Sequence, residues 1–142
     1  MVFVSLTRLR IRSVRFLPFF FVYAFRAVRQ VKKAAGFIAG GLLPDRGRTF
    51  WTLTAWDSQE SMRAYMTSGA HKQVMPHLLD WCDEASVAHW TQPDATLPTW
   101  AEADERMRES GRISKVRHPS PNHATLNYRA PRTSTGGPIR RG

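Results

Sequence analysis

Hydrophobic and polar positions near the start of the chain follow a period of two, the repeat of a β-strand. In residues 2–11, "VFVSLTRLRI", alternate side chains form two sets, one on each side of an extended backbone. Residues 48–56, "RTFWTLTAW", repeat this alternation with bulky side chains in both sets, so both faces of this strand are expected to be covered. Two more strands are predicted at residues 37–43 and 84–92.

The segments between these strands have apolar residues at helical spacing. One stripe begins near Pro18 and ends at Gly36, and a second begins after Ser58, breaks at Ser68-Gly69 and continues to Trp81. The resulting order, β-α-β-β-α-β, predicts an α+β fold of the ferredoxin-like class. Two helices cover only one face of a four-stranded sheet. We therefore expect a homodimer, in which a second copy covers the other face.

Composition changes twice along the chain and predicts three parts. Residues 1–92 form the ferredoxin-like α+β barrel domain, and residues 93–111 form a linker and a C-terminal helix. Residues 112–142 are basic and rich in Pro, Ser and Gly, with few large apolar side chains. Such a tail is expected to be disordered or draped over the domain.

The formal net charge of +10 is concentrated at the two ends of the chain. Residues 1–36 hold eight Lys or Arg and no acidic residue, and residues 111–142 hold seven and none. These ends can bind phosphates or an anionic membrane without specificity. No zinc-finger spacing or aromatic RNA-binding motif is present, which argues against sequence-specific nucleic-acid binding.

Cellular location is predicted from cysteine content and from the first apolar stretch. Cys82 is the only cysteine, which suits a reducing cytoplasm. The uncharged stretch at residues 16–25 is about half of the ~20 residues that a membrane-spanning helix needs. We expect a cytoplasmic protein, with peripheral contact at a membrane surface as the alternative.

The stretch "TFWTLTAWDSQESMRAYMTSGAHKQVM" resembles the dimeric α+β barrel group. It is most similar to spheroidene monooxygenase-like proteins and more distantly similar to antibiotic-biosynthesis monooxygenases, over about residues 3–91. The resemblance implies a monooxygenase-like oxidoreductase. Two positions depart from the antibiotic-type pattern: Thr54 stands where many members have Glu, and Tyr65 stands where many have His.

Two residues are candidates for catalysis. His71 follows the helix break and can act as a general base near neutral pH. The resemblance also implies a second role for His71, as an axial ligand to haem iron. Tyr65 can donate a proton or a hydrogen bond. The alternatives are a histidine bonded to a backbone carbonyl and a tyrosine packed in the core.

Four further side chains are candidates for lining a pocket for a small hydrophobic substrate: Trp56, Trp51, Thr54 and Trp90. Packing in the core and at a dimer seam would explain the tryptophans equally well. The glycines at residues 40–41 lack the spacing of a nucleotide-binding loop, so neither nicotinamide nor flavin is expected. The cofactor is therefore none or haem.

Three functions remain open from the sequence. The first is a monooxygenase acting on a small hydrophobic substrate in a dry aromatic pocket. The second is a non-catalytic dimeric module that binds a ligand or a partner. The third is an accessory protein at a membrane surface. Arg8, Arg10 and Arg12 alternate on one strand face and are expected to be exposed, with contact to an anionic group such as a carboxylate or a haem propionate as the alternative. The acidic residues Asp80, Asp83 and Glu84 are expected to be solvated, with paired catalytic carboxylates as the alternative.

Overall fold

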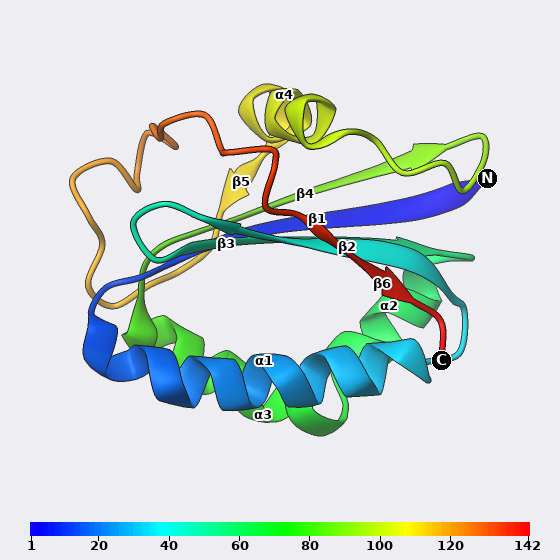
Figure 1. Ribbon diagram of the computed structural model, residues 1–142, viewed down its shortest axis with the longest axis horizontal. Coiled ribbons are helices and arrows are strands. Elements are labelled where there is room, and N and C mark those ends of the chain that lie inside the picture. Colours follow the sequence, from blue (N-terminus) through cyan, green and yellow to red (C-terminus); the bar gives the residue numbers. More distant parts are fainter.

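The computed structural model describes residues 1–142 and shows one antiparallel sheet between two layers (Figure 1). Helices α1, α2 and α3 lie below the sheet in this view, and α4 lies above it. The strands and helices are β1 (Val2–Ile11), α1 (Leu17–Lys32), β2 (Phe37–Asp45), β3 (Thr49–Trp56), α2 (Gln59–Met66), α3 (Gly69–Trp81), β4 (Cys82–Gln92), α4 (Trp100–Ser110), β5 (Arg112–Ile113) and β6 (Gly137–Arg140), with a 3₁₀ turn at Val14–Phe16 before α1.

The strand order is β5-β4-β1-β3-β2-β6. Its four inner strands, β4-β1-β3-β2, have the ferredoxin-like arrangement, which confirms the predicted fold class. In the antiparallel pair of β1 and β3, Ser5 lies opposite Thr54 and Thr7 lies opposite Thr52. This register places four hydroxyl side chains on the face that α1 and α3 cover.

The helix ends follow from local chemistry. The Ser58 hydroxyl accepts a hydrogen bond from the Ser61 N–H at the start of α2, and Thr99 forms a capping box with Glu102 at the start of α4. Between α2 and α3 the chain turns at Gly69, whose φ of +56° favours glycine. The break that the sequence predicted at Ser68-Gly69 therefore separates two helices.

The chain itself covers the upper face of the sheet. Trp51, Leu53 and Trp90 lie on this face in one cluster with Ala103 and Met107 of α4, both of which are fully buried. Tyr128, from the segment after α4, packs its ring edge-on against Trp51 with centroids 5.5 Å apart. The structure thus supplies an intramolecular cover where we expected a second subunit.

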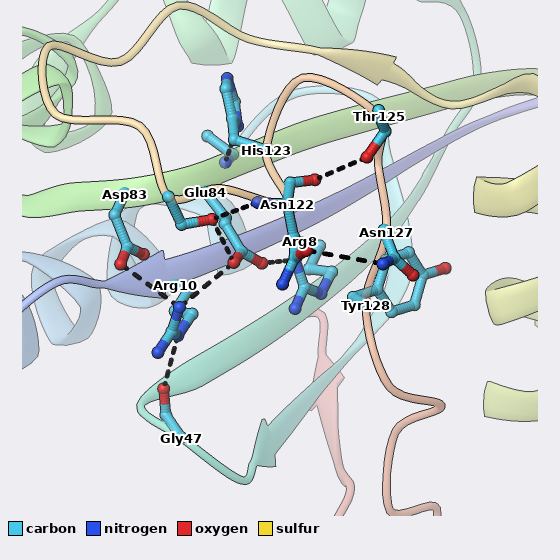
Figure 2. A network of polar contacts seen from close by, with 12 residues as sticks. Arg8, Arg10, Gly47, Asp83, Glu84, Asn122, His123, Thr125, Asn127 and Tyr128 are labelled. Carbon is cyan, nitrogen blue, oxygen red and sulfur yellow. Dashed lines mark hydrogen bonds and ion pairs between the residues drawn. The ribbon is translucent and has the colours of Figure 1, made fainter.

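A buried polar network holds the C-terminal segment on the sheet (Figure 2). Arg8 donates to Glu84 over 2.8 Å, and Ser120 donates to the same carboxylate over 2.7 Å. The Arg8 guanidinium lies 4.3 Å from the centroid of the Tyr128 ring. The expectation that Arg8 is exposed and Glu84 solvated is wrong, because this segment shields both from water. The alternative for Arg8, contact with a carboxylate, is what the structure shows.

No helix of the structure combines the length and the apolar composition needed to cross a bilayer.

Candidate functional site

A cavity of about 220 Å³ lies between the lower face of the sheet and helices α1 and α3. Most of its lining side chains are apolar, including Phe20 and Ala24 from α1 and Val74 from α3. Lys115, just after β5, is the only Lys, Arg, Asp or Glu among the lining residues. The cavity therefore suits a small hydrophobic molecule.

Four of the six sequence-predicted site residues line this cavity, and two do not. Thr54 and Trp56 reach it from β3, Tyr65 from α2 and His71 from α3. Trp51 and Trp90 lie in the cluster under α4, on the opposite face of the sheet. Successive side chains of a strand point to opposite faces, so Trp51 cannot share a pocket with its strand neighbours Thr54 and Trp56.

His71 has one ring nitrogen engaged and one free. Its Nδ1 lies 3.2 Å from the carbonyl oxygen of Met66. Because a carbonyl only accepts hydrogen bonds, Nδ1 carries the proton and Nε2 keeps its lone pair. Burial lowers the pKa of His71 below 6.5, and the hydrogen bond to Met66 opposes this shift only in part. The imidazole is therefore a neutral base at physiological pH.

Gln30 of α1 positions His71 and is a residue that the sequence analysis missed. Its Oε1 accepts the His71 backbone N–H over 3.0 Å, and its Nε2 donates to the carbonyl oxygens of Ser68 at 2.8 Å and Tyr65 at 3.2 Å. A Cβ on Gly69 would lie 3.0 Å from this amide. One side chain thus joins α1 to the break between α2 and α3.

Tyr65 is a wall of the cavity whose proton is engaged. Its hydroxyl donates to the carbonyl oxygen of Ala27 over 3.1 Å, and burial raises the pKa of its phenol. Its ring centroid lies 4.9 Å from that of His71 and 5.4 Å from that of Trp56. These contacts suit a residue that orients the imidazole and shapes the pocket, and they make Tyr65 a poor proton donor.

The hydroxyl groups of Ser5, Thr7, Thr52 and Thr54 form a polar strip on the floor of the apolar cavity. Within the chain, only Thr54 has a hydrogen-bond partner, because its Oγ1 accepts the Trp56 indole N–H over 2.9 Å. The other three hydroxyls are free to bond a ligand. A polar edge on an otherwise apolar ligand would meet them here.

The lining of the cavity offers few groups to hold a haem. A haem carries two propionates that need cationic partners, whereas Lys115 is the only Lys, Arg, Asp or Glu among the lining residues. No group of three or more His, Cys, Asp or Glu is arranged to hold a metal ion elsewhere in the chain. His71 is therefore better suited to act as a base than as a haem ligand.

Comparison with known sequences identifies a family. Residues 24–130 match the model of the family described as "Domain of unknown function (DUF3291)". This range includes α4 and the Tyr128 segment, so the cover on the upper face lies within the family model. No match was found among curated proteins.

Solved structures with the same fold include three that align over most of their own length. A conserved protein from Methanosarcina mazei Go1 has a TM-score of 0.58 at 14% identity, covering 66% of this chain and 94% of its own. The cofactor-independent oxygenase SnoaB from Streptomyces nogalater has a TM-score of 0.55 at 15% identity, covering 68% and 97%. An antibiotic biosynthesis monooxygenase has a TM-score of 0.57 at 11% identity, covering 66% and 100%.

These likenesses establish the fold. They confirm the predicted resemblance to the antibiotic-biosynthesis-monooxygenase type, and the nearer likeness to spheroidene monooxygenase stays a prediction.

Proposed function

We propose that this chain, which belongs to the DUF3291 family, is a monooxygenase. It oxidises a small hydrophobic substrate in the cavity beneath its sheet. One observation carries the proposal. His71, whose Nε2 is unprotonated, lines an apolar cavity of about 220 Å³. The shared fold with SnoaB, a cofactor-independent oxygenase, supports a reaction that needs no cofactor.

The chemistry starts with proton transfer. His71 Nε2 removes a proton from an activated CH₂ group of the substrate, and the resulting carbanion supplies the electrons that reduce O₂. A C–O bond forms between this carbon and O₂, and the proton held on Nε2 passes to the outer oxygen to give a hydroperoxide. Loss of the second C–H proton then breaks the O–O bond, and this proton leaves with the released hydroxide as water. Overall, R₂CH₂ and O₂ give R₂C=O and H₂O, so no external reductant is needed. Apolar walls keep water away from the carbanion.

The lining restricts the substrate to one kind of shape. The aromatic wall of Trp56 and Tyr65 suits a flat, unsaturated body. The free hydroxyls of Ser5, Thr7 and Thr52 suit oxygen atoms along one edge of that body. An oxygen substituent on this edge that is conjugated to a CH₂ group also lowers the pKa of that CH₂ group. Binding and deprotonation therefore favour the same substrate class.

Oxygen uptake by the purified protein tests the proposal. A panel of hydroxylated polycyclic aromatics with an activated CH₂ group should give one O₂ consumed per ketone formed, without added reductant. His71→Gln should abolish uptake while His77→Gln retains it, because His77 is exposed and does not line the cavity. A Soret band in the fresh protein, or equal uptake by the His71→Gln variant, would reject this mechanism.

A non-catalytic ligand-binding module is the second candidate, and the departures at Thr54 and Tyr65 favour it. Tyr65 has its hydroxyl proton engaged with Ala27, which leaves His71 as the only histidine or tyrosine in the cavity with a free ring or hydroxyl group for proton transfer, apart from Tyr23. Tight binding of the same aromatics without oxygen uptake would identify this function.

Homodimerisation and cytoplasmic residence stay predictions. Since α4 and the following segment cover the upper face of the sheet, a dimer must use another surface. Light scattering of the full chain measures the oligomeric state directly.

A further inference from the structure

The outer face of α1 exposes large apolar side chains along its first half. Phe19, Phe21, Val22 and Phe25 have exposed fractions of 59%, 51%, 51% and 64%. Single exposed apolar residues are common on soluble proteins, but a contiguous group on one helix face marks an interaction surface. We call these four residues the apolar patch of α1.

The same face becomes cationic along its second half. Arg26, Arg29 and Lys33 are exposed there, and the Arg29 guanidinium lies 5.8 Å from the centroid of the Phe25 ring. Residues 1–36 contain no Asp or Glu, so no acidic side chain from this part of the chain balances these charges. The face is thus apolar at one end and basic at the other.

The opposite face of α1 already has a role. Phe20, Ala24 and Val31 line the cavity, and α1 packs beside α3 below the sheet (Figure 1). Rotating the helix to bury the apolar patch would remove these residues from the cavity. Within the chain, Phe19 stacks on Trp81 and Phe21 packs edge-on against Phe50, yet all four side chains of the patch stay at least half exposed. The exposed part of the patch is therefore free to bind an external partner.

Charge decides between the possible partners. In a two-fold contact between the α1 helices of two copies, the basic half of one helix faces the apolar half or the basic half of the other, and residues 1–36 hold no Asp or Glu to pair with it. A surface that combines acyl chains with phosphates matches both halves. We propose that the outer face of α1 docks on an anionic lipid surface, with the apolar patch among the acyl chains and Arg26, Arg29 and Lys33 at the phosphates.

Docking places the helix parallel to the membrane. α1 has 16 residues and is not a membrane-spanning helix. Its apolar rings enter only the outer part of the acyl region, as in other interfacial helices. The cavity then lies on the other side of this helix, about 10 Å from the lipid. The docking inference does not depend on the proposed function, because it uses residues that face away from the cavity.

Co-sedimentation with vesicles tests the inference, using the full chain and no substrate. We expect binding to vesicles of phosphatidylcholine and phosphatidylserine, weaker binding at high salt, and little binding to phosphatidylcholine alone. Val22→Ser with Phe25→Ser should weaken binding at least tenfold, because both side chains enter the acyl region. Ile113→Ser, at a residue that is 47% exposed on β5, is the matched control and should bind as the unmodified chain does.

A second pair of variants separates this face from the basic tail. Arg26→Gln with Arg29→Gln should weaken binding by roughly fivefold per charge. Arg129→Gln with Arg141→Gln makes the same change in net charge at exposed tail residues and should have a smaller effect. Equal loss in the two pairs would overturn the inference. The inference would also be overturned if the variant with Val22→Ser and Phe25→Ser changed from dimer to monomer and bound vesicles normally, because the patch would then be a contact between copies of the chain.

Discussion

The His71 Nδ1 atom lies 3.2 Å from the carbonyl oxygen of Met66, at the break between α2 and α3. This contact fixes which ring nitrogen is protonated. It also fixes the orientation of the imidazole, whose ring packs 4.9 Å from that of Tyr65. It is also the contact that the structural alternative predicted, a histidine bonded to a backbone carbonyl, and it leaves Nε2 of the neutral imidazole unprotonated.

Substituting His71 by Gln should lower kcat by at least about 10²-fold, the usual contribution of a general base. Burial lowers the pKa of His71 below 6.5, so the unmodified protein should keep its activity at pH 6.5 and lose it only at lower pH. The same shift makes the folded state less stable as pH falls below 6.5, because the unfolded chain binds the proton more readily. A pH–rate profile with its acidic limb above pH 7 would contradict this assignment.

Replacing Gln30 by Leu should reduce kcat more than it raises KM. The substitution leaves the Ser68 and Tyr65 carbonyl oxygens and the His71 N–H without this partner, at a stability cost of about 1–3 kcal/mol. Gln30→Glu keeps the acceptor for His71 and loses the donors, so its kcat should be intermediate. Steady-state kinetics together with thermal unfolding separates mispositioning of His71 from a general loss of stability.

The Thr52→Val substitution should weaken binding of oxygenated ligands by about 0.5–1.5 kcal/mol and leave binding of matched hydrocarbons unchanged. Thr52 has a free hydroxyl on the cavity floor. Thr54→Val should instead lower the free energy of unfolding, because the Trp56 indole N–H loses its acceptor. Fluorescence titration with paired ligands that differ by one hydroxyl measures the first effect. Equal losses for both ligands would show that the hydroxyl does not contact them.

Removing the Glu84 carboxylate should loosen the C-terminal segment. Glu84→Ala leaves Arg8 buried without its partner, which costs about 3–5 kcal/mol. Burial alone would raise the pKa of Glu84, but the hydrogen bonds from Ser120 and Arg8 and the charges of Arg8 and Arg10 outweigh it, so the pKa lies below 4.5. The stability that this carboxylate contributes is present above pH 4.5 and lost as pH falls through the lowered pKa.

Urea unfolding at two pH values measures this linkage. Glu84→Gln should show a smaller loss of stability between pH 6 and about pH 3 than the unmodified chain does. Glu105→Gln, at an exposed position on α4, is the control and should leave that loss unchanged.

The Met107→Ala substitution should destabilise the fold by about 2–5 kcal/mol, because this side chain is fully buried between α4 and the sheet. Met75→Ala provides the comparison, since Met75 is 43% exposed and should cost less. Similar losses at both positions would mean that α4 is not part of the cooperative core.

The sequence predicted the order of the elements well, because periodicity is a local property. The alternation in "RTFWTLTAW" also contains the information that separates Trp51 from Trp56, since a strand sends them to opposite faces. The prediction that Trp51 and Trp90 line the pocket rested on their aromatic character and ignored that alternation. For Trp90 the strand register decides the face, because Trp90 lies opposite Val4 and therefore points to the same side of the sheet as Val4 does.

Two features lay beyond reach of the sequence because they depend on distant contacts. Gln30 is a polar residue on a helix, which is the usual pattern of a solvated side chain, and its role arises from a turn 38 residues away. The tail has few large apolar residues, yet Tyr128 is buried because Arg8 and Trp51 lie beneath it. Local composition therefore left open whether the tail is disordered or draped over the domain, and it gave no sign of the surface that receives Tyr128.

The C-terminal segment also occupies both borders of the sheet. The backbone N–H groups of Ser114 and Ser120 donate to the carbonyl oxygens of Ala85 and Asp83 along β4, and β6 pairs with residues 39–42 of β2. Unpaired strand borders act as templates on which other molecules add strands, and fibrils grow in this way. A protease that removed this segment would therefore create a chain prone to aggregation, even if the cavity below the sheet stayed intact.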